Sequence, residues 1–462
     1  CCIGAGYVGG PTMAVIAYKC PHLKVTVVDS DKEKINAWNG PLEKLPIFEK
    51  GLSQVVGTTR NKNLFFSTDI DKSINDCQII FMAVNTPTKL KGKGAGMAAD
   101  LSHVESCAKH ISRVAKSDKI VVEKSTLPVR TAEKIKKILN KNKNPINFEV
   151  ISNPEFLAEG TAIEDLFKSD RVLIGGDNTE NGRKAVKQLV DIYKNWIPFE
   201  KIITTNIWSS ELSKLASNAM LAQRISSINS LSVLCEKTGA NIEELSKAVG
   251  MDSRIGENFL KASPGFGGSC FQKDILNLVY LCEFYNLHEV ARYWEQVLTL
   301  NNWQKDRISK LIVNSLFGTV SNKKLAILGF AFKANTNDTR NSASIKICKD
   351  LIEEGAILSI YDPKVSKNQI ERDLVISPVD LPEDKEKKFL INAESLDTAI
   401  EGTHAIIILT EWSEFKEIKW DNVFKKMARP AWIFDTRSMI DVELAKKAGF
   451  NVWQIGNFTK FN

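Results

Sequence analysis

The sequence lacks a long apolar run, a cluster of like charges and spaced metal ligands. No apolar stretch reaches the ~18 residues that cross a bilayer, so we expect no membrane span. Its 62 basic and 55 acidic residues leave a net charge of only +7. That excess is too small for a dedicated nucleic-acid binder, but it suits an anionic small molecule such as a phosphate ester. The 5 histidines show no metal spacing, so we expect neither a metal nor histidine catalysis.

Cysteine is present, but not in a pattern that suggests cross-links. The 9 cysteines are odd in number and without zinc-ligand spacing, which indicates reduced thiols and a cytoplasmic protein. At about 150 residues per domain, the 462 residues predict three domains. Cores of that size need no disulfide or metal staple. Because the chain begins with Cys1 rather than Met, we expect trimming or processing at this end.

The opening residues resemble a dinucleotide-binding fingerprint. A short strand runs into Gly4-Ala5-Gly6-Tyr7-Val8-Gly9, a helix is expected over 11–18, and a strand over 25–28 ends in Asp29. The three glycines permit a tight turn, a close approach of backbone to pyrophosphate, and close packing of helix on sheet. Asp29 would accept hydrogen bonds from the adenosine ribose and repel a 2′-phosphate, which favours NAD over NADP. A bare glycine motif is often only a tight turn; the strands and acid in register favour the cofactor.

Three further buried strands end in polar turns that contain proline. They are expected over 78–84, 119–124 and 148–152, and they stop at Asn85-Thr86-Pro87, at Ser125-Thr126-Leu127-Pro128 and at Asn153-Pro154-Glu155. Ligands of parallel α/β sheets bind outside the carboxyl ends of the strands, so these turns are expected to line one crevice. Taken singly, each of these turns could equally be an ordinary loop that does not contribute to a ligand site.

The middle of the chain is helical, and the last third repeats the opening plan. Long helices are expected over 208–237, 273–285 and 290–317, the first carrying the apolar series Leu212, Leu215, Ala219 and Ala222. A strand that leads into a turn over 325–333, strands over 357–361 and 405–412 and a helix over 342–354 indicate a second Rossmann-like domain for a different nucleotide. Residues 364–388 are predicted to be an irregular surface insertion.

The predicted fold is therefore α/β, with two Rossmann-like doubly wound domains joined by a long central helix within a helical dimerisation domain. The expected boundaries are 1–207 for the NAD domain, 208–320 for the central domain with the cysteine loop, and 321–462 for the second nucleotide domain.

One cysteine stands out as a candidate nucleophile. Cys270 follows a glycine-rich turn and precedes a predicted helix, with Lys273 and Asp274 on the next turn. Helix N-terminal amides and a nearby ammonium favour the thiolate. Most free cysteines are small buried hydrophobes, and the other eight fit that description.

Two smaller groups of residues could assist the reaction of the Cys270 thiol. Lys214 and Asn218 are four apart on one helix face, one turn after Glu211, and could stabilise an oxyanion. From spacing alone, an exposed lysine beside a helix–helix hydrogen bond is the more frequent arrangement. Glu155 and Glu159 could supply a general base, or they could simply complement a helix dipole.

These strings resemble the nucleotide-sugar dehydrogenases over nearly the whole chain. The matching residues are Gly4 to Gly9, Val84-Asn85-Thr86-Pro87-Thr88, Glu123-Lys124-Ser125-Thr126, 152–160, 211–218 and 265–274. The glycine-rich cysteine string is the most specific. Ala158 and Gln272 are similar to the animal branch that oxidises UDP-glucose, whereas bacterial relatives often carry arginine and proline there.

The resemblance implies a four-electron oxidation of UDP-glucose to UDP-glucuronate with two NAD per turnover and no metal. Cys270 would form a thiohemiacetal and then a thioester, and Lys214 with Asn218 would hold the oxyanion. Lys214 and a water held by Asp274 would assist the first oxidation. Water activated by Glu155, or ordered by Thr126 and Asp274, would hydrolyse the thioester. A homodimer through the central helices, assembled into a hexamer, is also implied, with the partner's copy of Arg254 entering the site.

The resemblance also assigns binding residues. NAD is expected to contact Gly4, Gly6, Tyr7, Val8, Gly9, Asp29, Lys34, Val84, Asn85, Thr86, Pro87, Thr88, Ser125, Thr126, Glu159, Lys273 and Arg340. UDP-sugar is expected to contact Glu155, Phe156, Leu157, Ala158, Glu159, Lys214, Asn218, Arg254, Lys261, Phe266, Gly267, Phe332, Lys333 and Arg437.

Three alternatives remain at this point. A sister enzyme acting on UDP-N-acetylmannosamine or GDP-mannose would share the cysteine and the NAD apparatus. A single-step hydroxyacid dehydrogenase can use a helical lysine and asparagine but has no need of Cys270. A non-catalytic sensor of NAD and UDP-sugar would not need the acid, base and thiol that are all present here.

Overall fold

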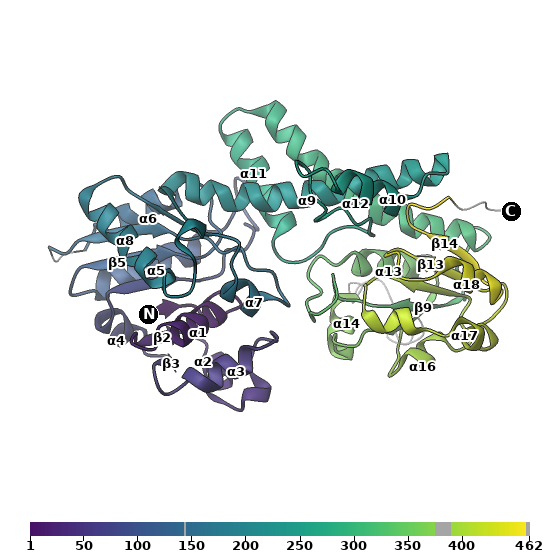
Figure 1. Ribbon diagram of the computed structural model, residues 1–462, viewed down its shortest axis with the longest axis horizontal. Helices are drawn as coiled ribbons and strands as arrows, with labels where there is room; N and C mark the ends of the chain where they lie inside the picture. Colours follow the sequence, from purple (N-terminus) through teal and green to yellow (C-terminus); the bar gives the residue numbers. More distant parts are fainter. Residues whose placement is uncertain (143–144, 375–389, 459–462) are drawn as a thin grey trace. The chain divides into compact units, whose positions relative to one another are not determined.

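The computed structural model describes residues 1–142, 145–374 and 390–458. The described residues form two compact units, the first within 1–217 and 276–287 and the second within 218–275 and 288–462 (Figure 1). Each unit is built around one predominantly parallel sheet. The division into three domains stays a prediction.

The first sheet has eight strands in the order β3-β2-β1-β4-β5-β6-β7-β8. The strands are β1 (Cys2–Ile3), β2 (Val25–Val28), β3 (Leu64–Ser67), β4 (Ile79–Met82), β5 (Lys119–Glu123), β6 (Phe148–Ser152), β7 (Val172–Gly176) and β8 (Ile202–Asn206). The six strands from β3 to β6 are parallel and follow the doubly wound order, whereas β7 pairs antiparallel with β6. The carboxyl ends of β1, β4, β5 and β6 therefore lie along one edge, as the sequence predicted.

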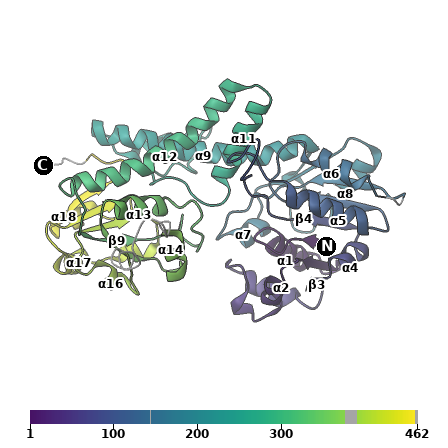
Figure 2. The ribbon, with the colours of Figure 1, turned by 180° about the vertical axis from the view of Figure 1, so that it is seen from behind.

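Helices cover both faces of this sheet (Figure 2). They are α1 (Gly9–Lys19), α2 (Lys32–Asn39), α3 (Leu52–Thr59), α4 (Ile70–Asp76), α5 (Ser102–Val114), α6 (Thr131–Leu139), α7 (Ala162–Phe167) and α8 (Glu180–Tyr193). Apolar residues of α1, α3, α7 and α8 share one core with the sheet, and those of α4, α5 and α6 share another. The β-strands are hydrophobic on both faces because both faces are covered.

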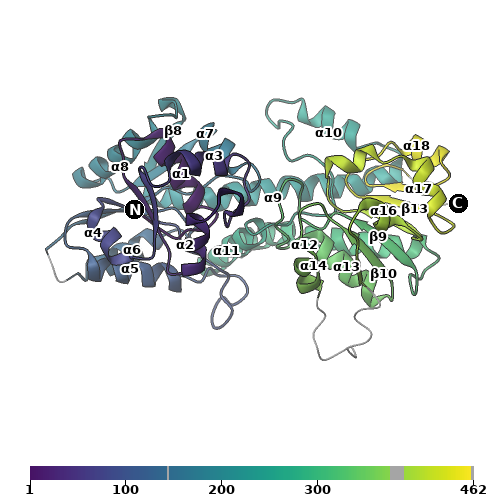
Figure 3. The same cartoon turned by 90° about the horizontal axis from the view of Figure 1, so that it is seen from below.

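The second sheet has six parallel strands in the order β11-β10-β9-β12-β13-β14. They are β9 (Lys324–Leu328), β10 (Ile357–Tyr361), β11 (Leu390–Asn392), β12 (Ala405–Ile408), β13 (Trp432–Asp435) and β14 (Asn451–Gln454). Its helices are α13 (Ala343–Glu353), α14 (Lys367–Leu374), α16 (Leu396–Ile400), α17 (Trp420–Lys426) and α18 (Val442–Lys447) (Figure 3). The strand order matches that of β3 to β6 in the first sheet, so the predicted second Rossmann-like sheet is confirmed.

Four helices occupy the middle of the chain: α9 (Ile207–Thr238), α10 (Ile242–Gly250), α11 (Phe271–Phe284) and α12 (His288–Ser315). The predicted long helices are thus confirmed to within a few residues. Leu215, Ala219 and Ala222 of α9 are buried as expected, but Leu212 is 41% exposed. None of the helices in the described ranges is long and apolar enough to cross a membrane.

One local prediction was wrong. Residues 364–388 were expected to be irregular, yet Lys367–Leu374 is a helix, α14, while 375–388 lie outside the described residues. This helix is mostly polar, and it is anchored because Ile370 and Leu374 pack into the core of the second unit. Two apolar residues one turn apart are too short a pattern to predict a helix from sequence.

Candidate active site

The glycine-rich turn after β1 has the geometry of a nucleotide cradle. Gly4 adopts a φ of +112°, and a Cβ there would lie 2.4 Å from the Ala83 carbonyl oxygen. A Cβ on Gly9 would lie 2.0 Å from the Gly4 oxygen, so both positions require glycine. A Cβ on Gly6 meets no atom within 4 Å, which leaves open space in front of that residue. The N-terminus of α1, which has no side-chain cap, follows directly, so the residues fit the phosphates of a dinucleotide.

Asp29 lies at the end of β2, where the fingerprint requires an acid. Its carboxylate accepts the Ala5 N–H and the Asp31 N–H at 3.0 Å each, and the Lys34 ammonium lies 3.0 Å away. Burial raises the pKa of Asp29, but these donors outweigh it and the net pKa is lowered. The carboxylate is therefore anionic and held against the turn that it was predicted to serve.

The turns after β4 and β5 also meet, as predicted. The Ser125 hydroxyl donates to the Val84 carbonyl oxygen at 2.6 Å, and the Thr86 hydroxyl donates to the Thr126 carbonyl oxygen at 3.2 Å. These bonds join the Val84–Thr88 and Ser125–Thr126 segments at the same edge of the sheet as Gly4.

Glu155 lies in a buried polar cluster that the sequence did not predict. Its Oε1 accepts the N–H groups of Phe156 and Leu157 at 2.7 and 2.8 Å, and its Oε2 lies 3.1 Å from Lys124 Nζ. The same ammonium donates to Asn153 Oδ1 at 3.2 Å and to the Tyr193 hydroxyl at 3.4 Å. The alternative that Glu155 complements a helix dipole does not hold, because the next helix, α7, starts at Ala162.

Electrostatics fix the charges within this cluster. Burial raises the pKa of Glu155, but the Lys124 ammonium and the backbone N–H groups outweigh it and the pKa is lowered. Burial likewise opposes the charge on Lys124, but Glu155 and Tyr193 raise its pKa. The pair is therefore a buried ion pair, and Glu155 is an anion able to accept a hydrogen bond from water. Lys124 follows a strand as an isolated lysine, and no sequence signal marks its burial.

Lys214 is buried, contrary to the more frequent exposed arrangement. It is 6% exposed, and its Nζ lies 5.4 Å from the centre of the Phe156 ring. The Arg171 guanidinium covers the same ring at 3.9 Å. Both cations contact a ring from the 155–159 segment, so the structure brings Lys214 together with the predicted substrate-binding residues of the first unit.

In the second unit, Cys270 has the setting of a reactive thiol. It directly precedes α11, its carbonyl oxygen accepts the Asp274 N–H at 2.9 Å, and its side chain is exposed. The Ser269 hydroxyl lies 3.4 Å from its sulfur. The other eight cysteines are buried or half-buried, which confirms the expectation that Cys270 differs from them.

Asn218 and Asp274 form a buried pair beside this helix start. The Asn218 side-chain nitrogen donates to Asp274 Oδ2 at 2.6 Å, and the two residues are 5% and 1% exposed. They come from α9 and from the first turn of α11, so the helix face that carries Asn218 is directed to the turn that follows the thiol.

Several predicted UDP-sugar residues gather around the cysteine loop. The Gly268 N–H donates to the Arg340 carbonyl oxygen at 2.7 Å, and a Cβ on Gly267 would lie 2.9 Å from the Phe332 Cβ. Arg437 donates to the Phe332 carbonyl oxygen at 3.1 Å and to the Leu409 carbonyl oxygen at 2.8 Å.

The remaining predicted cations of this unit are not all brought to the loop. Arg254 is exposed and pairs with Asp252 at 2.6 Å, and Arg340 pairs with Asp338 at 2.7 Å. Lys261 is exposed, and Lys333 lies over the adjacent Phe332 ring at 5.7 Å.

Buried amides that sequence reasoning missed hold the backbone of the same loop. Asn301 accepts the Phe266 N–H at 2.8 Å and donates to the Phe266 carbonyl oxygen at 3.2 Å. Asn229 accepts the Ser263 N–H at 2.8 Å, and Gln304 donates to the Ser263 carbonyl oxygen at 3.0 Å. In the sequence these are ordinary polar residues of long helices, without a pattern that distinguishes them from their neighbours.

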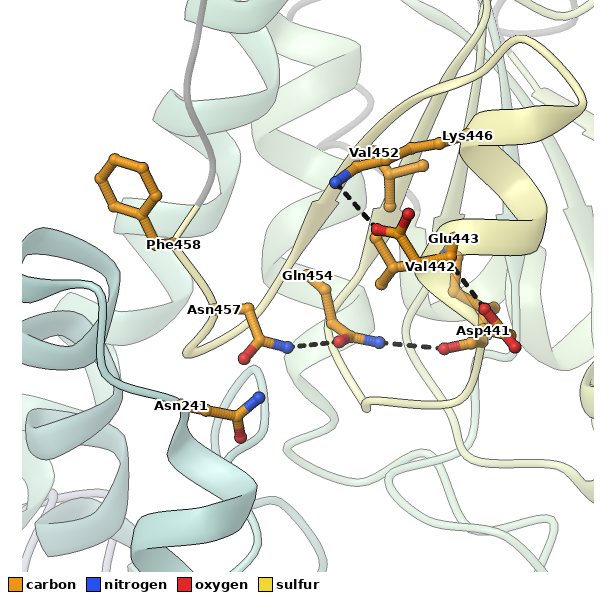
Figure 4. Close-up of a pocket in the computed structure, with 10 residues that line it drawn as sticks. Asn241, Asp441, Val442, Glu443, Lys446, Val452, Gln454, Asn457 and Phe458 are labelled. Carbon is orange, nitrogen blue, oxygen red and sulfur yellow. Dashed lines mark hydrogen bonds and ion pairs between the residues drawn. The ribbon is translucent and has the colours of Figure 1, made fainter.

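A cavity of about 330 Å³ lies elsewhere in the second unit, between α10, α18 and β14 (Figure 4). None of its ten lining residues was predicted to bind or react. Among the described residues, no group of three or more histidine, cysteine or acidic side chains is arranged to hold a metal ion.

A dinucleotide cradle in the first unit and an exposed thiol at a helix start in the second are the features expected of a nucleotide-dependent dehydrogenase. Profiles of one family match most of the chain. They are the UDP-glucose/GDP-mannose dehydrogenase family NAD binding domain at residues 1–197, its central domain at 208–303 and its UDP binding domain at 326–442. The chain belongs to this family, and its cofactor is NAD.

Individual proteins agree with the profiles. The chain is 57% identical to UDP-glucose 6-dehydrogenase of Drosophila melanogaster, over 99% of this chain and 96% of that protein. It is also 57% identical to the Mus musculus enzyme of the same name, over 99% and 92%. Plant relatives are as similar, with 56% identity to UDP-glucose 6-dehydrogenase 4 of Oryza sativa over 99% and 96%.

A solved structure supports the fold. A UDP-glucose dehydrogenase from Pyrobaculum islandicum aligns with a TM-score of 0.84 at 27% identity, over 99% of this chain and 97% of that one.

Proposed function

We propose that this chain is an NAD-dependent UDP-glucose 6-dehydrogenase, which oxidises UDP-glucose to UDP-glucuronate in two steps. The observation that carries the proposal is the exposed thiol of Cys270 at the start of α11, beside the buried Asn218–Asp274 pair. A single alcohol-to-aldehyde oxidation needs no thiol. An oxidation that continues to the acid does, because a covalent adduct retains the aldehyde between the two steps.

The first unit would hold the cofactor. Gly4, Gly6 and Gly9 leave room for the pyrophosphate at the N-terminus of α1, and Asp29 would accept the ribose hydroxyls. The segments around Thr86 and Thr126 would contact the nicotinamide half. When bound, NAD accepts a hydride from C6 of the sugar in each of the two oxidations.

The thiol carries the chemistry between the oxidations. After the first hydride leaves, Cys270 attacks the aldehyde carbon, forming a C–S bond, and a proton is delivered to the new hydroxyl of a thiohemiacetal. Loss of a second hydride from the same carbon and of the hydroxyl proton gives a thioester. Water then adds to the thioester, the C–S bond breaks, and the acid and the thiol are released.

Polar groups would stabilise the charge that develops on the C6 oxygen. The Lys214 ammonium is one, and the second hydrogen on the Asn218 side-chain nitrogen is the other, since one hydrogen already engages Asp274. Lys214 and a water held by Asp274 would assist the removal of the first hydroxyl proton. Glu155, fixed as an anion by Lys124, would accept a hydrogen bond from the hydrolytic water, which Thr126 and Asp274 would help to order.

The second unit would bind the UDP portion and the sugar. Phe266, Gly267, Phe332 and Arg437 already lie together there, and Lys333 is adjacent. Glu155 to Glu159 are also proposed to contact the sugar.

The proposed reaction has a defined stoichiometry. The purified chain, supplied with UDP-glucose and NAD, should release two NADH for each UDP-glucuronate. Cys270→Ser should still bind UDP-glucose but release no UDP-glucuronate, while Cys107→Ser, which changes a buried cysteine, should behave as the wild type. A ratio of one, or full activity in Cys270→Ser, would overturn the thioester route. Turnover of UDP-N-acetylmannosamine or GDP-mannose without turnover of UDP-glucose would overturn the substrate.

The protein is further proposed to be a cytoplasmic homohexamer built from dimers. Met220, Leu231 and Leu234 lie on one face of α9 and are 58%, 39% and 59% exposed, which is the character of an interface helix. Arg254 is exposed, consistent with a role for the copy that the partner would supply. Light scattering should give a multiple of the 51.6 kDa chain mass, and Leu234→Glu should lower it. A wild-type monomer would refute the assembly.

A further inference from the structure

Two glutamates meet inside the first unit, away from the ion pairs already described. Glu123 is the last residue of β5 and is 2% exposed; Glu211 lies in α9 and is 3% exposed. Each carboxyl group is placed to form a side-chain hydrogen bond with the other, provided that one of the two carries a proton. If both carboxyl groups were ionised, they would repel each other strongly in the buried interior, so their proximity requires an explanation.

The two carboxyl groups have different surroundings. Glu211 Oε2 accepts the Arg130 N–H at 2.7 Å, and its Oε1 accepts the Ala132 N–H at 2.8 Å. These amides open helix α6, where a negative charge is favourable. Glu123 has no such support, because both of its oxygens are buried and neither receives a hydrogen bond from a donor among the described residues.

The cations near Glu123 pair with or contact other groups. The Arg130 guanidinium pairs with Glu133 at 2.8 Å and lies over the Trp208 ring. The Lys124 ammonium pairs with Glu155 at 3.1 Å. Lys214, one turn further along α9, contacts the Phe156 ring. None of these described contacts neutralises Glu123, so a proton is the remaining way to make the carboxyl contact attractive.

We propose that Glu123 is a protonated carboxylic acid that donates an O–H···O hydrogen bond to the Glu211 carboxylate, and that this bond positions the cofactor turn. Glu123 is two residues before Ser125, and Glu211 is three residues before Lys214 on α9. The bond therefore joins the strand end that leads into the Ser125–Thr126 turn to the helix that carries Lys214. Both are positioning residues, and their link to NAD rests on the proposed function.

The acid–base properties of the pair agree with this assignment. Burial raises the pKa of Glu123, and the adjacent Glu211 raises it further. Burial also raises the pKa of Glu211, but the backbone amides that donate to its carboxylate oppose that effect. Because only Glu211 has donors that favour its anion, the shared proton resides on Glu123.

Substitutions at Glu123 distinguish a role as a hydrogen-bond donor from a role in which the side chain only fills space. Glu123→Gln keeps a side-chain donor of the same shape and should keep NAD affinity within about twofold of the wild type. Glu123→Met removes the donor at similar volume and should weaken NAD binding on the order of tenfold, the scale of one lost hydrogen bond to a charged group. Glu149→Gln, at a partly buried glutamate of β6 that also has a raised pKa, is the matched control and should bind NAD normally.

Infrared spectroscopy provides a readout that a purely structural role would not change. The wild-type spectrum at pH 7 should contain the carbonyl stretch of a protonated carboxylic acid that is absent from Glu123→Gln and present in Glu149→Gln. Absence of that difference band would overturn the proton assignment, and normal NAD affinity in Glu123→Met would overturn the positioning role. If Glu123→Met does not fold, the band and the affinity of Glu123→Gln still decide. If the wild type itself fails to bind NAD, the proposed function fails, while the difference band still tests the pair.

Discussion

Removal of the Lys124 ammonium should be among the most destabilising single changes in the first unit. Lys124 Nζ and Glu155 Oε2 are 3.1 Å apart, and their side chains are 4% and 11% exposed. Lys124→Met keeps the volume but leaves the Glu155 carboxylate buried without its counter-ion. Loss of one partner of a buried pair costs about 3–5 kcal/mol, so the free energy of unfolding should fall by that amount at pH 7.

The structure offers a control variant and a rescue variant for the Lys124→Met prediction. Lys184 and Glu180 lie closer, at 2.6 Å, but their side chains are 66% and 76% exposed; Lys184→Met should therefore cost no more than about 1 kcal/mol. Glu155→Gln in the Lys124→Met background should recover most of the loss, because it removes the unpaired charge while an amide oxygen still accepts the N–H groups of Phe156 and Leu157.

The pH dependence of the two proteins should have opposite signs. In the wild type the pKa of Glu155 is lowered, so its contribution to stability is present above the ordinary glutamate pKa of 4.5 and is lost as the pH falls through the lowered pKa of the folded state. In Lys124→Met burial acts unopposed and raises that pKa, so the variant should lose stability as the pH rises from 4.5 upward. Urea unfolding, with hydrogen exchange followed on peptides from β5, β6 and α8, measures both. A cost in Lys124→Met no larger than in Lys184→Met would refute the reasoning from burial.

Two further predictions concern the cradle and the thiols. Gly9→Ala should prevent proper folding of the turn, since its Cβ would lie 2.0 Å from a backbone oxygen. Gly6→Ala, whose Cβ meets no atom within 4 Å, should fold normally and lose NAD affinity instead. Thermal unfolding and calorimetric titration with NAD distinguish the two variants, and equal Tm losses would contradict the assignment of open space at Gly6. Iodoacetamide should label Cys270 before any other cysteine, because Cys270 is exposed while burial raises the pKa of Cys2 and Cys107 to about 12. Mass spectrometry of the labelled peptides tests the order of labelling, and early labelling of Cys2 or Cys107 would contradict the prediction.

Local patterns predicted most of the elements correctly. The strands at 25–28, 148–152 and 357–361 have the predicted bounds, because each is a short apolar run closed by a polar residue. The strand-plus-glycine pattern of the cradle, the long helix α9 and the helix start after Cys270 were recognisable for the same reason: each depends on residues close together in the sequence. The exceptions, α14 and Leu212, are positions where neighbours distant in sequence decide burial.

Most of the candidate active site needed both the residues and the fold. Cys270, Lys214, Asn218 and Glu155 were identifiable from their residue types and strings, but their charge states and partners were not. Lys214 was more simply interpreted as an exposed lysine, and only the packing of Phe156 and Arg171 against α9 explains its burial. Lys124 and Tyr193 are 69 positions apart, and no local pattern predicts their 3.4 Å contact.

The sequence by itself determined two Rossmann-like halves and a cradle suited to NAD, and it distinguished one cysteine as the predicted nucleophile. These follow from short-range chemistry: glycine where backbone must turn or approach closely, alternation of apolar strands with helices, and a thiol next to helix amides. The tertiary structure alone decided which charges are paired. It buried Lys124 against Glu155, because the parallel strands β5 and β6 end at the same edge of the sheet. It also brought Glu123, at the end of β5, beside Glu211 of α9. Water is excluded from both places, so each buried charge or polar group requires a partner.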